Sequence, residues 1–203
     1  MKVLLVYVFS FLFLCTASAQ WNKTIPQQIQ LGVMAGGGYY LGSQKTALHG
    51  AFGGFATFDA TEHFSIRGQL VYTKLTGQSS VDNPGFSINL FETDLLGEYN
   101  FLNMYDGQHV FTPYVTTGFG ITGNLSLDAA NNGNGGTSVI VPLGGGGKWA
   151  LNKNVQLRLE YIHRITFGND LSYPNSKWHG TYGMALLGIS IRLSSLLSPG
   201  RYE

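Results

Sequence analysis

Residues 155–165 read VQLRLEYIHRI, and apolar and polar side chains alternate along nearly all of this stretch. One face would carry Val155, Leu157, Leu159, Tyr161 and Ile165, and the other Gln156, Arg158, Glu160 and Arg164. A period of two is typical of a β-strand whose two faces meet different environments. The stretch is longer than the five or six residues of an ordinary strand. Its length matches the ~9–11 residues that a strand needs to cross a bilayer.

Seven further segments show the same alternation, clearly or weakly: residues 28–40, 47–59, 64–73, 91–101, 110–123, 138–151 and 187–193. The faces of residues 47–59 stay unassigned, because glycine and phenylalanine dominate that segment. Short joints at 59–62 and 151–154 alternate with longer ones, at 76–86, 125–137 and 168–178. Outer-membrane barrels have short periplasmic turns and longer outer loops. The sequence therefore predicts an all-β fold, an eight-stranded antiparallel up-and-down transmembrane β-barrel with both termini periplasmic.

The composition supports lipid rather than water around the barrel. Only 11% of the 203 residues are charged, against ~25% in soluble domains. A soluble eight-stranded barrel such as a lipocalin is the alternative, and it would turn its charged face outward. The net charge of +1 and the lack of a basic tract argue against a nucleic-acid partner. The expected partner is outer-membrane lipid.

The N-terminus predicts export. Lys2 precedes an apolar run at 3–14, and Ala17-Ser18-Ala19 matches a signal-peptidase site. We therefore divide the chain into a cleaved leader at 1–19, a barrel domain at 20–193 and a short periplasmic tail at 194–203. A lipoprotein anchor on Cys15 is the alternative, although Leu14 stands where such signals have a small residue. The expected location is the outer membrane of a Gram-negative-type cell.

The polar faces are expected to point into the barrel, where side chains fill the space inside eight strands. This predicts an interior charge network of Arg67, Glu92, Asp94, Glu98, Lys148, Arg158, Glu160, Arg164 and Arg192. Unpaired buried charges cost several kcal/mol each, so the network should be paired. Gly144 and Gly146 would leave room for the long side chains. Aromatic residues expected at the two membrane interfaces are Tyr39, Tyr40, Tyr72, Tyr99, Phe101, Trp149 and Trp178.

Motifs for other chemistry are incomplete. Residues 118–123, GFGITG, fit a dinucleotide-binding pattern, but a polar loop follows instead of a helix. A P-loop ending at Lys148 would need glycine where Pro142 stands, so we expect no nucleotide and no cofactor. The five histidines show no metal-ligand spacing. We expect no catalytic residues.

A lipid hydrolase is the enzymatic alternative. The strand around His163 resembles that of barrel lipid A deacylases, but Ile165 stands where those enzymes have serine. A catalytic set of Asp170, Ser172, Ser176 and His179 would have to assemble within one loop.

Several segments together resemble a family of small outer-membrane barrels that includes PorG, a component of the type IX protein secretion system. The segments are YYLG at 39–42, FSIR at 64–67, FETDLLGEYNF at 91–101, TPY at 112–114, VPLG at 141–144, and the runs 155–160 and 164–171. The resemblance implies a non-enzymatic accessory barrel with a structural or scaffolding role. Its implied partners are periplasmic or outer-membrane secretion proteins. A surface-binding or adhesion barrel, using the loops at 76–86 and 125–137, is the other open interpretation.

Overall fold

A computed structural model describes residues 28–41, 45–78, 86–102, 109–124, 137–167 and 181–193. The predicted leader at 1–19 and tail at 194–203 lie outside these ranges. The strands are β1 (Gln28–Tyr40), β2 (Lys45–Thr46), β3 (His49–Asp59), β4 (Phe64–Gln78), β5 (Phe86–Asn100), β6 (Phe111–Asn124), β7 (Thr137–Ala150), β8 (Val155–Phe167) and β9 (Thr181–Arg192). The described part of the chain holds no helix long and apolar enough to span a bilayer.

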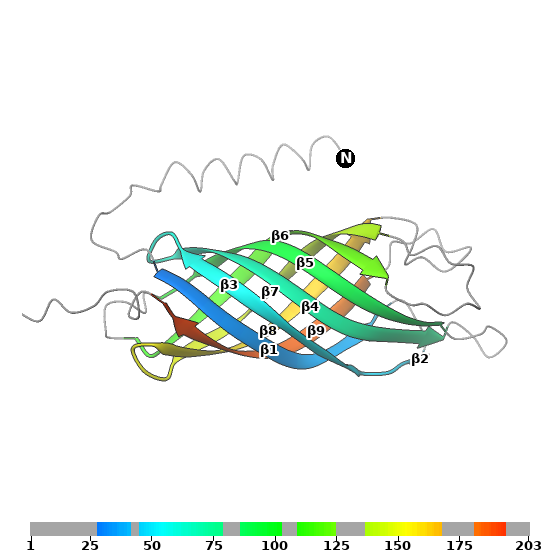
Figure 1. Ribbon diagram of the computed structural model, residues 1–203, viewed down its shortest axis with the longest axis horizontal. Helices are drawn as coiled ribbons and strands as arrows, with labels where there is room; N and C mark the ends of the chain where they lie inside the picture. The colour runs from blue at the N-terminus through cyan, green and yellow to red at the C-terminus, as the bar shows by residue number, and fades with distance from the viewer. Residues whose placement is uncertain are drawn as a thin grey trace, which may run out of the picture.

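Eight long strands form one closed antiparallel sheet (Figure 1). Each long strand pairs with the long strands before and after it in the chain. The two-residue strand β2 pairs with the last residues of β4, beyond the part of β4 that pairs with β3. Closure comes from β1 and β9, which pair from Gln30↔Arg192 to Tyr40↔Tyr182. The predicted eight-stranded up-and-down barrel is confirmed. Closure leaves no long edge with unsatisfied backbone groups, which is the condition for a sheet in lipid.

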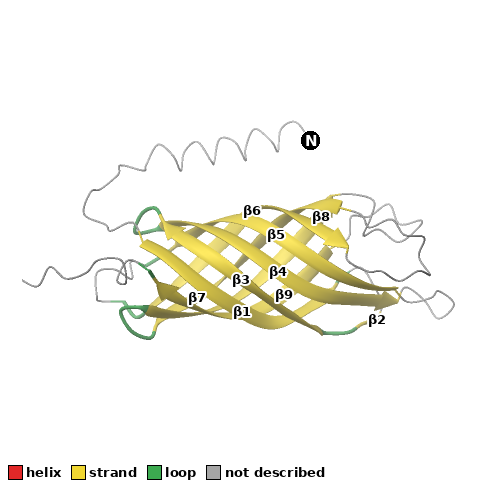
Figure 2. Cartoon of the chain, in the orientation of Figure 1, coloured by secondary structure: helices red, strands yellow, loops and turns green. Residues whose placement is uncertain are grey.

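Two tight turns lie at one end of the barrel, at 60–63 and 151–154, where both described chain ends also lie (Figure 2). We call this the turn end and the opposite one the loop end. Side chains cap the turns: Thr61 Oγ1 accepts from the backbone nitrogen of Phe64 at 2.9 Å. Asn152 Oδ1 accepts from those of Asn154 and Val155, each at 2.8 Å. Such local bonds satisfy backbone donors where the ladder ends.

The strands alternate between a buried inner face and an exposed outer face. The segment whose faces could not be assigned from sequence follows the rule too: Phe52 is 59% exposed, whereas Phe55 is 5% exposed and lies inside. Outward-facing large apolar residues include Leu31, Val33, Leu70, Leu95, Val115, Phe119, Leu143, Leu159, Leu187 and Ile189. A soluble barrel has its apolar face inside, whereas the apolar face of this barrel is outside.

The inward-facing glycines of β7 prevent a collision with the backbone of β8. A Cβ atom on Gly146 would lie 2.1 Å from the carbonyl oxygen of Leu159, and one on Gly144 would lie 2.3 Å from that of Tyr161. Room for long charged side chains, the role predicted for these two glycines, is seen at Gly188, where a Cβ atom would lie 2.9 Å from Arg158 Cγ, and at Gly120. A Cβ atom there would lie 2.0 Å from Asp94 Oδ1.

Candidate functional site

The barrel interior contains a network of ion pairs centred on Glu98 of β5. Its carboxylate lies 3.0 Å from Arg67 Nε, 2.9 Å from Arg158 Nη1 and 2.6 Å from Lys148 Nζ. Arg67 comes from β4, which is paired with β5, whereas Lys148 and Arg158 come from β7 and β8, which are not, so these last two contacts cross the lumen. All four side chains are almost fully buried. Buried charges are tolerated when they are paired and hydrogen-bonded in this way.

A second group of charges lies nearer the loop end. Arg164 Nε is 2.7 Å from Glu92 Oε2, and its Nη2 is 3.7 Å from Asp94 Oδ2. The hydroxyl of Tyr182 donates to Glu92 at 2.7 Å. The amide of Gln69 donates to Asp94 at 2.6 Å. Each carboxylate in this group therefore has an arginine and a neutral donor.

Glu160 and two aromatic rings complete the central packing. Arg67 Nη1 donates to Glu160 at 2.8 Å, and the Tyr114 hydroxyl donates to the same carboxylate. The guanidinium of Arg158 lies 4.4 Å from the ring centre of Phe55, and Lys148 Nζ lies 4.6 Å from that of Tyr114. Cations over ring faces gain electrostatic attraction. The sequence pattern placed Tyr114 on the inward face of its strand, but it left the face of Phe55 unassigned.

Asp59 is the interior acid that sequence reasoning missed. It accepts from Gln30 Nε2 and from Ser65 Oγ, each at 2.7 Å. With it, five buried acids face five buried bases in the described strands: Asp59, Glu92, Asp94, Glu98, Glu160, and Arg67, Lys148, Arg158, Arg164, Arg192. Asp59 ends β3, the segment whose faces the sequence left unassigned. Knowing that Phe58 faces outward would have placed it.

Arg192 lies at the turn end, at the border of the interior. It is 9% exposed, and its Nη1 donates to the backbone oxygen of Lys153 at 3.1 Å. The structure thus brings eight of the nine predicted charged residues into the two ion-pair groups, and it places Arg192 against the 151–154 turn.

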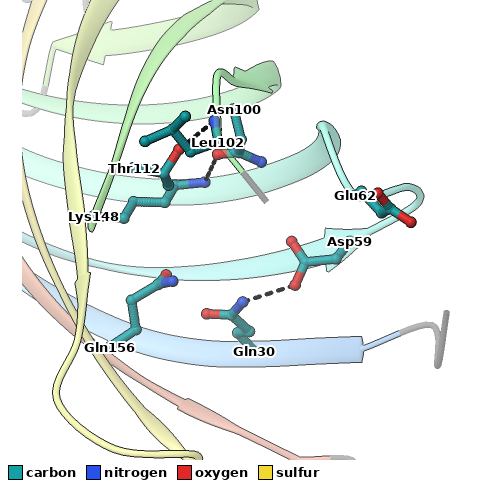
Figure 3. A pocket seen from close by; sticks show the side chains of 8 residues that line it. All are labelled: Gln30, Asp59, Glu62, Asn100, Leu102, Thr112, Lys148 and Gln156. Carbon is teal, nitrogen blue, oxygen red and sulfur yellow. Dashed lines mark hydrogen bonds between the residues drawn. The ribbon is translucent and has the colours of Figure 1, made fainter. Parts of the chain in front are cut away.

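A shallow polar pocket opens at the turn end (Figure 3). It is lined by Gln30, Asp59, Glu62, Asn100, Leu102, Thr112, Lys148 and Gln156. Figure 3 shows Lys148 directed at Asn100, whose Oδ1 accepts from Nζ at 2.7 Å. Lys148 therefore joins the pocket to Glu98.

The loop-side part of the interior also holds an apolar cluster, which the alternation did not predict. Its cluster consists of Met34, Tyr40, Ala51, Phe55, Val71, Leu75, Leu90, Tyr182, Met184 and Leu186. Apolar residues on the inner face broke the alternation in the sequence and weakened its signal there. The Glu98 network thus fills the turn-side part of the lumen, whereas this apolar cluster and the Arg164–Glu92 group share the part toward the loop end.

Tyr40 corrects the predicted interface residues. It is 8% exposed and belongs to the inner apolar cluster. Adjacent strand residues face opposite ways, so Tyr39 and Tyr40 cannot both meet lipid. Tyr39 is the outward one, and its hydroxyl lies 3.1 Å from that of Tyr161.

The other predicted interface aromatics that the structure describes lie on the outer face. Tyr99 and Phe101 make an edge-to-face contact at 5.5 Å, and Trp149 packs on Phe111 at 4.8 Å, all near the turn end. Tyr72 packs on Phe52 at 5.1 Å, closer to the loop end. Trp178 is outside the described residues.

Candidate enzymatic and metal chemistry can be placed only in part. His163 is half-exposed on the outer face of β8. Its direct partners across the sheet are Leu143 and Gly183, neither of which can act as a nucleophile. Within the described ranges, no three His, Cys, Asp or Glu side chains are placed to hold a metal ion. Asp170, Ser172, Ser176 and His179 lie outside those ranges.

Comparisons agree with this architecture. A family model described as the outer membrane protein beta-barrel domain matches residues 8–184. Neisserial surface protein A is similar in structure, with a TM-score of 0.56, 15% identity and coverage of 80% of this chain and 96% of its own. Ail, the attachment invasion locus protein of Yersinia pestis, is also similar in structure, with a TM-score of 0.51 and 12% identity. The match covers 83% of this chain and 99% of Ail. These likenesses concern the fold. No curated protein matches the sequence.

Proposed function

The chain belongs to the outer membrane protein beta-barrel domain family, and on that premise we propose that it is a non-enzymatic structural barrel that serves as a scaffold for other envelope proteins. The observation that carries this proposal is the filled interior. Arg67, Arg158 and Arg164 are among its largest fully buried side chains, and they are held by carboxylates from other strands. Function then belongs to the outer surface and the two rims.

The proposed orientation puts the turn end in the periplasm. An even number of strands brings both ends of the barrel to one side, and short turns are typical of the periplasmic side. The chain offers a clean test, because its single cysteine is Cys15 in the predicted leader. Cysteine at Lys153, in the 151–154 turn, should react with an impermeant maleimide only after the outer membrane is permeabilised. Labelling in intact cells would reverse the orientation.

We further propose that the barrel is an accessory component of the type IX secretion system. The family resemblance of residues 91–101 and 164–171 supports this role. An apolar group at the turn-end rim supports it too, because Leu151 is 58% exposed and Val110 is 65% exposed. The backbone oxygen of Val110 accepts from Ala150 nitrogen at 2.8 Å, which brings Val110 next to Leu151 in space. A periplasmic protein could cover this pair.

Site-specific photocrosslinking tests the secretion role. A photoreactive residue at Leu151 should trap a periplasmic or outer-membrane component of the secretion machine in living cells. The same residue at Leu159, on the lipid-facing side of β8, is the matched control and should trap none. Normal export of type IX substrates by a deletion strain, or identical products from both positions, would overturn this role and leave the barrel assignment standing.

A surface-binding barrel is the second candidate. Its support is that the barrel shares its fold with a protein described as an attachment invasion locus protein. Replacing residues 126–135 with a short Gly/Ser linker should then abolish adhesion of cells that display the barrel, without lowering its amount in the membrane. Unchanged adhesion would remove this candidate.

A further inference from the structure

The charged side chains of the long strands point into the barrel, with one exception among the described residues. Ten charged residues of the eight long strands are buried, as given above, whereas Lys74 of β4 is exposed on the outer face. Its neighbours Thr73 and Leu75 point inward and are fully buried. An outward charge in the hydrocarbon layer would cost about 2–4 kcal/mol. The depth of Lys74 in the membrane therefore decides what this residue does.

Strand geometry puts Lys74 at the far edge of the apolar band. Phe64 begins β4 at the turn end, and Lys74 follows ten positions later. At ~3.3 Å per residue and a tilt of about 40°, that separation spans about 25 Å along the membrane normal. The apolar band of such barrels is itself about 25 Å tall. The ammonium group thus reaches the headgroup level on the loop side.

Lys74 belongs to a small polar patch. Its direct partner across the sheet is Asn89, and the next outward pair toward the loops is Thr76↔Ser87. We call these four residues the β4–β5 rim patch. The outward pair on the membrane side of the patch is Tyr72↔Phe91, so the surface changes from aromatic to polar within one step.

Among the described residues of the long strands, no other charged side chain is exposed on the outer face. Strands β4 and β5 have 15 residues each, and the other long strands have 11–14. Near the loop-side ends of the other strands, exposed apolar residues are Leu41, Leu48, Ile121, Val139 and Phe167. The extra length of the β4–β5 hairpin carries its polar pairs to the headgroup layer.

The donors of the patch match a phosphate group. Lysine supplies an ammonium, asparagine supplies an amide, and serine and threonine supply hydroxyls. The Thr76 hydroxyl also lies 2.7 Å from His49 Nε2, which fixes its position. Lysine is a common phosphate ligand in proteins.

We propose that the β4–β5 rim patch binds the phosphate of a lipid headgroup in the outer leaflet, with Lys74 as the charged anchor. This inference rests on the orientation proposed above, and it requires no secretion partner. The barrel would then hold a phosphorylated lipid at one fixed point on its circumference.

Residue-level NMR titration tests the proposal. The protein is folded in dodecylmaltoside micelles, which contain no phosphate and leave both rims accessible, and titrated with bis-phosphorylated lipid A. Shifts should concentrate at Lys74, Thr76, Ser87 and Asn89. Lys74→Ala should weaken the apparent affinity about fivefold, the loss expected for one basic residue at a lipid surface. Lys74→Arg should retain it.

Lys153→Ala is the matched control, because it removes an equal charge from the opposite rim and should titrate like the unchanged protein. Dephosphorylated lipid A should produce no shifts in the patch. Wild-type affinity of Lys74→Ala, equal binding of the dephosphorylated lipid, or shifts centred elsewhere would overturn the proposal. Equal shifts with inorganic phosphate alone would overturn the lipid source. Because micelles leave both rims accessible to the added lipid, a wrong orientation leaves these outcomes unchanged and is detected separately by the maleimide experiment.

Discussion

Glu98 is the residue through which the charges of four strands meet. Its two carboxylate oxygens contact Arg67, Lys148 and Arg158 at 2.6–3.0 Å. A neutral side chain at this position would leave three buried cations with less compensation. Removing one partner of a buried ion pair is more damaging than never having had the pair, because the remaining charge stays desolvated.

We therefore expect Glu98→Gln to lower the free energy of unfolding by about 3–5 kcal/mol. Urea unfolding in lipid vesicles, followed by tryptophan fluorescence, measures the change. Glu62→Gln makes the same chemical change at a half-exposed turn residue and should cost less than about 1 kcal/mol. Equal losses from both variants would contradict the assignment of Glu98 as the centre of the network.

The positions of single residues show which features of the interior could be predicted from the sequence. Alternation placed Arg67, Glu98 and Arg158 on inward faces, because the period of two fixes the face of each residue. It could not show which charges meet across the lumen, since that depends on the register of strands distant in the chain. Tyr40 was misplaced because two adjacent aromatics hide the phase. Asp59 was missed because glycine-rich β3 gives no apolar pattern.

At the level of elements, the turns connect neighbouring strands and the outer faces of the strands face lipid. The 151–154 turn was predictable from its polar composition between two alternating segments. The cap that Asn152 forms inside it was not, since Asn152 and Asn154 look equivalent in sequence. Only the backbone geometry assigns the acceptor to Asn152.

Asn152→Ala should therefore destabilise the β7–β8 hairpin by about 1 kcal/mol, the usual net value of a hydrogen bond. Asn154→Ala, two positions away in the same turn, should have little effect. The temperature at which the folded form converts to the unfolded form on a gel provides the measurement. A larger loss from Asn154→Ala would show that the capping is wrongly assigned.

The outer faces of the strands should respond to charge by depth. Leu159 lies in the middle part of β8, and Val139 lies near the loop-side end of β7; both are about half exposed. Arginine at Leu159 should cost about 2–4 kcal/mol and arginine at Val139 about 0–1 kcal/mol. Reversible unfolding in phospholipid vesicles gives both values. Equal costs would mean that the two positions do not differ in depth.

At the scale of the whole molecule, the lumen is filled by its own side chains. Arg67, Arg158, Arg164, Tyr114 and Tyr182 are all fully buried across it, and an apolar cluster occupies much of its loop-side half. The sequence predicted a plugged barrel from strand number and charge. It did not predict the apolar cluster toward the loop end, because the period of two gives the face of a residue and not which inward residues gather at one height along the barrel axis.

A filled lumen predicts a closed barrel. Liposomes containing the protein should take up arabinose no faster than protein-free liposomes, whereas liposomes containing a general porin should swell rapidly. The swelling rate, followed by light scattering, gives the comparison. Uptake that rises in proportion to the amount of folded barrel would show that solutes pass through it.

The pairing of β1 with β9 has a consequence for biogenesis. The strand nearest the start of the barrel is completed only by the strand nearest its end, from Gln30↔Arg192 to Tyr40↔Tyr182. A chain that ends before residue 181 would thus leave the edges of β1 and β8 unpaired. The hydrocarbon core of a bilayer cannot satisfy the free backbone donors and acceptors of such edges. The barrel can therefore close only after residues 181–192 have been synthesised, which separates translation from insertion for this topology.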